Sequence, residues 1–185
     1  MNRFRSAISL SIAIIAFSVA GVGAQTVSGT RSAAVNSIDR QIHKQLIMLP
    51  NYGVFDHITF QNNGGVVTLR GEAYSLGTAS SAAHVVKTIP GVTQVINNIR
   101  ELPPSPFDDS IRRRLIREFT NAGGLNVDFS SPNPEVSIVV ENGRVTLEGY
   151  VSSTYSSNIM NVLANGVTGV FSVKNNLIVG KDALR

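Results

Sequence analysis

The chain reads Gly65-Val66-Val67-Thr68-Leu69-Arg70-Gly71 at one point and Gly143-Arg144-Val145-Thr146-Leu147-Glu148-Gly149 at another, 78 residues later. At this offset, and without a gap, 11 of the 36 positions from 64 to 99 are identical. Average composition predicts about two identities over such a length. We therefore infer an internal duplication, so that the two copies share one fold.

Each copy predicts the same order of elements: helix, strand, strand, helix, strand. The first helices are expected to begin near Asp39 and Asp108, where an acidic residue can cap the first turn. Asn63-Gly64-Gly65 and Asn142-Gly143 are typical of tight hairpins. Apolar residues recur at helical spacing, at Ile42, Leu46, Ile47 and Leu49, at Ile111, Leu115, Ile116 and Phe119, at Ala82, Val85, Val86 and Ile89, and at Met160, Leu163, Ala164 and Val167.

This pattern predicts an α+β protein with two tandem α-β-β-α-β domains, each a three-stranded sheet with two helices on one face. The domains are expected at residues 36–102 and 108–179, joined by a proline-rich linker at 103–107 and followed by a tail at 180–185. Upstream of the hairpins the copies match at an offset of 69, so the second copy carries nine extra residues. They fall within Asn121–Glu135, whose Gly, Ser, Asn and Pro residues indicate an exposed loop.

Residues 1–24 have the pattern of a secretory signal peptide. Arg3 and Arg5 precede an apolar run from Ala7 to Ala20, and Val22-Gly23-Ala24 supplies small residues before a cut. We expect cleavage near Ala24, a flexible segment at 25–35 and a periplasmic location. The apolar run is shorter than the ~20 residues of a spanning helix, and an uncleaved anchor is the alternative.

Two motifs together resemble the BON domain family. They are the hairpin G-x-V-T-L-x-G and the final strand G-V-x-x-V-x-N-x-[IL], which occurs at 91–99 and 169–177. The resemblance covers nearly all of the chain that would remain after cleavage of the signal peptide. It implies a non-enzymatic cell-envelope protein; tandem BON proteins associate with phospholipid membranes and support envelope integrity under osmotic or other stress.

The residues shared by the copies are mostly of the kind that define a fold. The glycines are expected to permit positive φ or close approach of two chain segments, or to stop the second helix. The two asparagines lie on the apolar face of the last strand and are expected to satisfy loop backbone groups. The set is Gly65, Gly71, Gly91, Asn97, Gly143, Gly149, Gly169 and Asn175.

No catalytic, metal or cofactor site is predicted. The chain has no Cys, and His43, His57 and His84 have neither each other nor carboxylates at a known metal-ligand spacing. Residues 166–169 have the G-x-x-G form of nucleic-acid-binding KH loops, but the first copy lacks the leading glycine. Removal of the signal lowers the formal net charge from +4 to +2, and an exported protein rarely meets nucleic acid, so no nucleic-acid partner is expected.

The candidate binding surface is a basic cluster on the first helix of the second copy, at Arg112, Arg113, Arg114 and Arg117. Because Ile111, Leu115 and Phe119 take the buried stripe, the last three arginines are expected to project outward. Basic residues near an anionic bilayer gain ~1 kcal/mol each, which favours a peripheral phospholipid contact. A solvated face with an Arg114–Glu118 pair is the alternative. A structural or adaptor module, with a protein partner or self-association, is the competing function.

Overall fold

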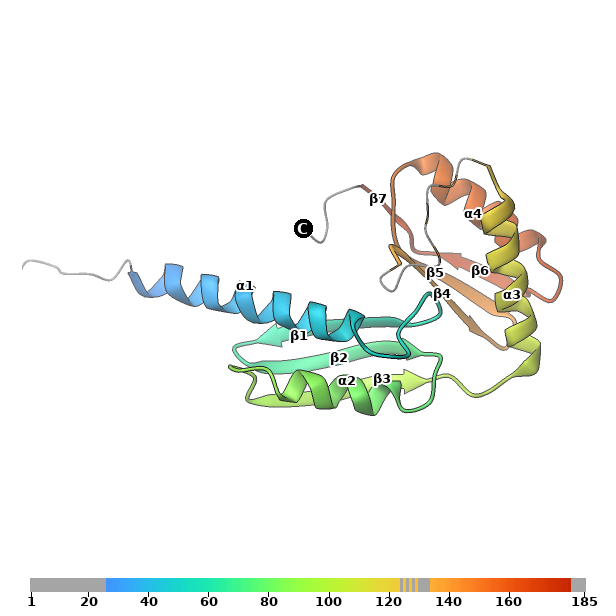
Figure 1. The fold of residues 1–185 in the computed structure, drawn as a ribbon. Coiled ribbons are helices and arrows are strands. Elements are labelled where there is room, and N and C mark those ends of the chain that lie inside the picture. The colour runs from blue at the N-terminus through green and yellow to red at the C-terminus, as the bar shows by residue number, and fades with distance from the viewer. Residues whose placement is uncertain (1–25, 124, 126, 128, 130–133, 181–185) are drawn as a thin grey trace, which may run out of the picture.

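Two similar α+β domains follow one another in the computed structural model, which describes residues 26–123, 125, 127, 129 and 134–180. The first contains α1 (Thr26–Ile47), β1 (His57–Asn63), β2 (Val66–Ala73), α2 (Thr78–Lys87) and β3 (Gln94–Glu101). The second contains α3 (Pro106–Asn121), β4 (Val136–Glu141), β5 (Arg144–Val151), α4 (Thr154–Gly166), β6 (Ser172–Asn175) and β7 (Ile178–Val179) (Figure 1). The expected signal peptide and residues 181–185 of the expected tail lie outside the described residues.

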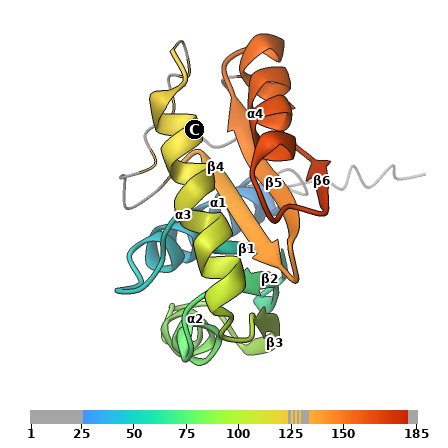
Figure 2. The same cartoon turned by 90° about the vertical axis from the view of Figure 1, so that its right-hand side faces the viewer.

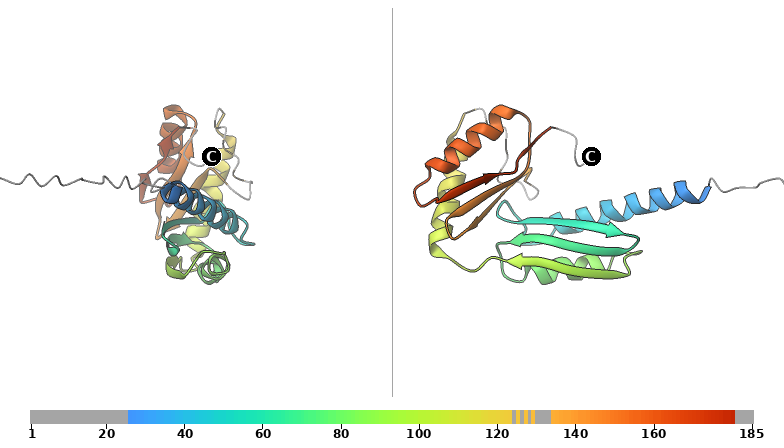
Figure 3. Two further views of the ribbon diagram at one scale, coloured as in Figure 1. Left: turned by 90° about the vertical axis from the view of Figure 1, so that its left-hand side faces the viewer. Right: turned by 180° about the vertical axis from the view of Figure 1, so that it is seen from behind.

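The two sheets have the same topology. In the first domain β2 is central, antiparallel to β1 and parallel to β3. In the second domain β5 is central, antiparallel to β4 and parallel to β6 and β7. Figure 2 shows α3 and α4 on one face of the second sheet, and Figure 3 shows the first sheet from the face that its helices leave open. The predicted fold class is confirmed.

Tight turns and one close approach fix the register of each hairpin. Asn142 and Gly143 have φ of 51° and 73°, as a two-residue type I′ turn requires. Further along each central strand, Gly71 and Gly149 also have positive φ, at 118° and 108°. A Cβ at either glycine would collide with a backbone carbonyl oxygen of the neighbouring strand region, so no other residue fits.

The acidic residues at the first helices act on the hairpins instead of capping their own helices. Asp108 is 2% exposed, and its carboxylate accepts hydrogen bonds from the backbone N–H groups of Asn142 and Gly143 at 2.9 and 2.8 Å. In the first copy, Asp39 accepts from the side chain of Asn62 at 2.7 Å. The cap of α3 is Ser105, whose hydroxyl accepts from the Asp108 N–H. This helix therefore begins earlier than predicted.

Three expected boundaries were wrong. α1 begins at Thr26, so the segment from 26 to 35 is helical instead of flexible; no proline interrupts the chain between Thr26 and Ile47. The Pro-rich linker is shorter than expected, because Pro106 occupies the first turn of α3, where its missing N–H costs nothing. The last strand of the second copy is split into β6 and β7, both paired with β5.

α1 extends well past the edge of the first sheet (Figures 1 and 3). Within the described residues, no helix combines the length and the apolar character needed to cross a bilayer.

Each domain has its own core, but the first domain contributes to the second. The first core is built around Ile42, Leu69 and Val86, and the second around Ile111, Leu147 and Met160. Val54, from the loop between α1 and β1, is buried in the second core, and Phe55 packs against it. The two domains are therefore joined by apolar packing as well as by the linker.

We predict that Asp108→Ala lowers the free energy of unfolding by about 2–3 kcal/mol, because two backbone N–H groups at the β4–β5 turn lose their acceptor. Urea denaturation followed by circular dichroism measures this. Glu118→Ala, on the exposed side of the same helix, supplies the control. Equal stability of the two variants would contradict the hairpin role of Asp108.

Candidate functional site

The predicted arginine cluster is divided between two sides of α3. Arg113, Arg114 and Arg117 are exposed, as expected. Arg112 is 2% exposed and does not share their surface. Its inclusion in a membrane-facing cluster is therefore corrected: the side of α3 that carries Arg112 is covered by the first domain.

The guanidinium of Arg112 lies at the junction of the two domains. Within its own domain it donates to the Asp109 carboxylate at 2.6 Å and to the Val140 carbonyl oxygen. Its Cζ lies 4.4 Å from the ring centroid of Tyr74 and 6.0 Å from that of Phe55. Both rings belong to the first domain and meet edge to face, with their centroids 5.7 Å apart. A desolvated cation over aromatic faces gains about 2 kcal/mol.

The same junction covers the free edge of β4. The N–H of Ile138 donates to the carbonyl oxygen of Val54 at 2.7 Å, so a loop of the first domain pairs with this edge strand. β4 is accordingly buried at five consecutive residues, although a sheet covered on one face alternates. At the rim, Arg100 of the first domain forms a solvent-exposed, bidentate ion pair with Glu141 of the second, and it also lies 3.6 Å from Glu72.

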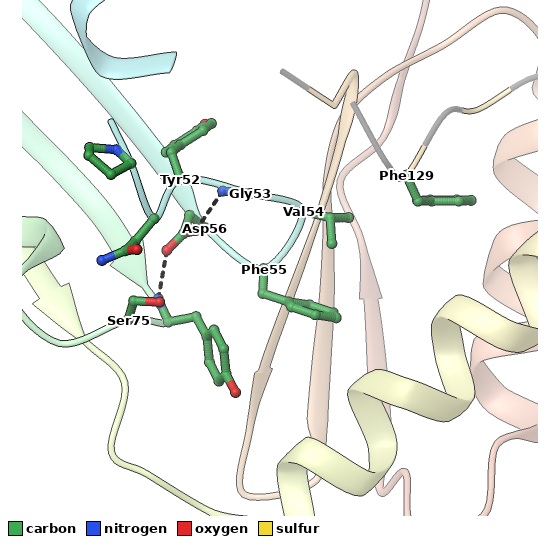
Figure 4. Close-up of a pocket in the computed structure, with 10 residues that line it drawn as sticks. Tyr52, Gly53, Val54, Phe55, Asp56, Ser75 and Phe129 are labelled. Atoms are coloured by element: carbon green, nitrogen blue, oxygen red, sulfur yellow. Dashed lines mark hydrogen bonds between the residues drawn. The ribbon is translucent and has the colours of Figure 1, made fainter. Parts of the chain in front are cut away.

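A shallow, open hollow of about 460 Å³ lies beside the junction, on the loop that precedes β1. Figure 4 shows this loop reaching the strands of the second domain, with Asp56 turned back into its own loop. The Asp56 carboxylate accepts from the N–H groups of Gly53 and Tyr74, both at 2.8 Å.

Burial dominates the titration of the groups in this hollow. It raises the pKa of Asp56, although the two N–H bonds and the charge of Arg112 act in the opposite direction. Burial, followed by the charge of Asp56, raises the pKa of Tyr52 to about 12. Tyr52 therefore stays neutral near pH 7.

An exposed aromatic pair lies at the end of the second domain where α3 begins. Phe107 and Phe171 are 48% and 76% exposed, and their rings stack with centroids 6.2 Å apart. Arg114 donates to the carbonyl oxygen of Thr168, in the loop that leads to Phe171. We call the pair of Phe107 and Phe171 the apolar tip. The hydrogen bond to Thr168 therefore connects one exposed arginine to the loop that carries this tip. Among the described residues, no ion pair joins Arg114 to Glu118.

The pair of Phe107 and Phe171 was not predicted from the sequence. A comparison of the two copies could have indicated it. Phe107 and Phe171 correspond to Ile38 and Thr93 of the first copy. A large aromatic residue in place of threonine on a loop between elements is unusual unless it packs or binds.

The other shared residues take structural positions. Asn97 and Asn175 are exposed, and they donate to the carbonyl oxygens of Ala79 and Ser157 in the first turn of each second helix. Their side-chain oxygens accept from the N–H groups of Ile99 and Leu177. Each asparagine thus joins the last strand of its domain to the preceding helix, and Asn175 also satisfies a backbone group between β6 and β7, as expected. Gly91 and Gly169 have positive φ but follow the helix ends by a few residues. Gly65 lies in the β1–β2 turn, as Gly143 does in the other domain.

A family model described as the BON domain matches this chain twice, at residues 35–103 and 107–181. The matches correspond to the two structural units and together cover most of the chain. A comparison with curated proteins finds none that matches.

Among solved structures, the chain is similar to the C-terminal domain of CdsD, a structural protein of the type III secretion system of Chlamydia trachomatis. The identity is 14%, over 77% of this chain and 96% of that chain, with a TM-score of 0.30. A second CdsD structure has 14% identity, over 78% of this chain and 94% of that chain, with a TM-score of 0.29. Similarity at this level carries no argument about function.

We predict that Asp56 makes the stability of the protein depend on pH. A carboxyl whose pKa is raised by folding stabilises the folded state below its ordinary pKa of 3.8, and this contribution is lost as the pH rises through the folded value. The free energy of unfolding of the unmodified protein, relative to Asp56→Asn, should therefore fall as the pH rises above 3.8.

Thermal unfolding of both proteins across this range gives the comparison. Glu118→Gln, which removes a carboxylate from the exposed face of α3, corrects for the general effect of one lost charge. A difference that grows in favour of the unmodified protein as the pH rises would show that the hydrogen bonds to Asp56, not its burial, dominate.

Proposed function

This chain belongs to the BON domain family as a tandem repeat, and from this premise we propose that it binds the surface of anionic phospholipid membranes and supports envelope integrity under osmotic or other stress. BON domains occur in envelope-associated proteins, and the family is generally non-catalytic. The observation that carries the membrane proposal is that exposed arginines lie along α3 and that exposed aromatic rings lie at the end of the domain where this helix begins.

The second domain offers a membrane surface both positive charges and apolar rings. Arg113 and Arg117 lie four residues apart and so share a side of α3, and Arg114 links that side to the tip. Arg144, at the start of β5, is also exposed, and it follows the turn residue Gly143. Each basic group near an anionic surface contributes ~1 kcal/mol.

The aromatic pair supplies an apolar contact beside these charges. The ring of Phe171 lies over the β4–β5 turn, where a Cβ on Gly143 would come within 2.5 Å of its Cδ2. One side of the Phe171 ring thus packs on the β4–β5 turn, and the rest of the ring is exposed to solvent. Aromatic side chains next to basic groups are typical of surfaces that rest in the interface of a bilayer.

We predict that Arg113→Glu/Arg114→Glu/Arg117→Glu lowers affinity for phosphatidylglycerol-containing vesicles by at least about tenfold. Vesicle co-sedimentation at several salt concentrations measures this, and binding by the unmodified protein should weaken as salt rises. Arg40→Glu/Lys44→Glu/Lys87→Glu changes the net charge equally on exposed positions of the first domain and should retain binding.

Tryptophan fluorescence with the same vesicles tests the apolar part of the contact separately. Because the chain has no Trp, Phe171→Trp reports on this position alone, and its emission should shift to shorter wavelength with anionic vesicles. Tyr155→Trp, exposed at the start of α4, should not shift. Figure 2 shows that the two helices run in opposite directions, so this control lies at the other end of the domain. Equal binding by both triple variants, without a shift at Phe171→Trp, would overturn the proposal.

The periplasm is the proposed location, on the basis of the signal-peptide pattern in residues 1–24. We predict that the exported protein begins at Gln25, because small residues precede this position. Mass spectrometry of the periplasmic fraction, with and without a high-salt wash of the membranes, measures both the cleavage and the peripheral association. A retained N-terminus in a salt-resistant membrane fraction would indicate an anchor instead.

A structural or adaptor role is the second candidate. α4 contains no charged residue, and its Tyr155 and Val162 are 60% and 64% exposed. An uncharged helix face with exposed apolar groups favours a protein partner or self-association over an anionic surface. Salt distinguishes the two functions, because association through such a face is insensitive to ionic strength.

A further inference from the structure

We propose that Arg112 is a positioning residue, whose guanidinium holds the two BON domains in one relative orientation. It does so by resting on aromatic rings of the first domain while bonded within the second. The consequence for membrane binding rests on the proposed function: this orientation keeps the first domain against one side of α3 and leaves Arg113, Arg114 and Arg117 clear.

Arg112 makes contacts in both domains. Asp109 and the Val140 carbonyl anchor its planar head to α3 and β4. Tyr74 and Phe55, which follow β2 and precede β1, supply the rings. A guanidinium fixed by hydrogen bonds at its edge can meet these rings in few orientations, so the contact specifies an angle as well as an attachment.

Burial of the Arg112 charge has a free-energy cost. Among the described residues Arg112 is the one buried cation, and its Nε has no hydrogen-bond partner. The salt bridge to Asp109 is only partly shielded from water, since the carboxylate side chain is 30% exposed. An apolar side chain of similar volume is often as stabilising as a buried ion pair, and sometimes more so. Stability alone therefore does not account for an arginine here, whereas a fixed orientation does.

The apolar contacts at the junction do not by themselves require one angle between the domains. Val54 and Phe55 pack on the second core, and apolar packing is non-directional. The Val54–Ile138 hydrogen bond supplies one direction, and the solvent-exposed, bidentate Arg100–Glu141 pair supplies a second. Arg112 adds a third directional contact, and it is the charged contact that is buried.

The experiment is a distance measurement in the full chain. Because the protein has no Cys, Ser81→Cys on α2 and Asn158→Cys on α4 give one exposed spin-label site in each domain without background. Double electron–electron resonance in solution, without lipid, should show one narrow distribution for the unmodified junction. Arg112→Met should give a distribution at least about twice as broad, as expected when a domain interface loses its buried directional contact.

Arg112→Met retains volume and apolar packing, so urea denaturation should show cooperative unfolding close to that of the unmodified protein. Arg112→Lys retains the charge but not the planar head, and its width should lie between the two. On the partner side, Tyr74→Ala should broaden the distribution and Tyr74→Phe should not, because the phenyl face is kept.

A narrow, unshifted distribution in Arg112→Met overturns the proposal, because the cation would then be unnecessary for the orientation. Broadening by Tyr74→Phe as large as by Tyr74→Ala also counts against it, since the ring face would then not be the contact. None of these measurements requires a bilayer, so failure of vesicle binding and failure of the orientation role are observed separately.

Discussion

The burial of one positive charge between the two domains constrains the rest of the molecule. A guanidinium that is 2% exposed must find its partners locally, and Arg112 finds hydrogen bonds in its own domain and aromatic faces in the other. This requires the loop with Phe55 and the turn with Tyr74 to lie against α3. The first domain is thereby assigned to one side of this helix, and the arginines of the other side remain in water. What the second domain presents to its surroundings follows from that assignment.

The two copies share the constraints of the fold and differ where they meet other molecules or each other. Gly71 and Gly149 solve the same steric problem, and Asp39 and Asp108 both bind their hairpins. The positions at which the copies differ lie on the surface of the individual domain, although the other domain can cover them. His43 corresponds to Arg112 at the offset of 69, and Thr93 corresponds to Phe171 at the offset of 78. The two copies thus differ at the junction and at the aromatic pair, while the strand pairing of their hairpins is the same.

The sequence was sufficient for the parts of the fold that local rules govern. The duplication, the hairpin turns and the apolar stripes were predicted because each depends on residues close in the chain or on a repeat that a single sequence reveals. Arg112 was misplaced for the complementary reason. It lies next to Ile111 at the edge of the buried stripe of α3. Its burial depends on contact with the first domain, and helical periodicity gives no information about such a contact. The aromatic tip was missed because Phe107 and Phe171 are 64 positions apart and meet only when α3 and the loop before β6 are folded. The helical segment from 26 to 35 was not predicted because its Thr, Ser, Val and Gly residues have low helix propensity.

On the proposed function, the charges and the rings at the tip act over different distances. Attraction between the exposed arginines and an anionic bilayer extends roughly 8–10 Å at moderate salt. The aromatic pair gains nothing until it leaves water, because burial of apolar surface is a contact effect. Arginines therefore govern how often the protein meets the membrane, and Phe107 and Phe171 govern how long it remains. A domain that tumbled freely against its neighbour would present both only part of the time. A rigid junction removes that loss, which is why a costly buried cation is consistent with a weak peripheral binder.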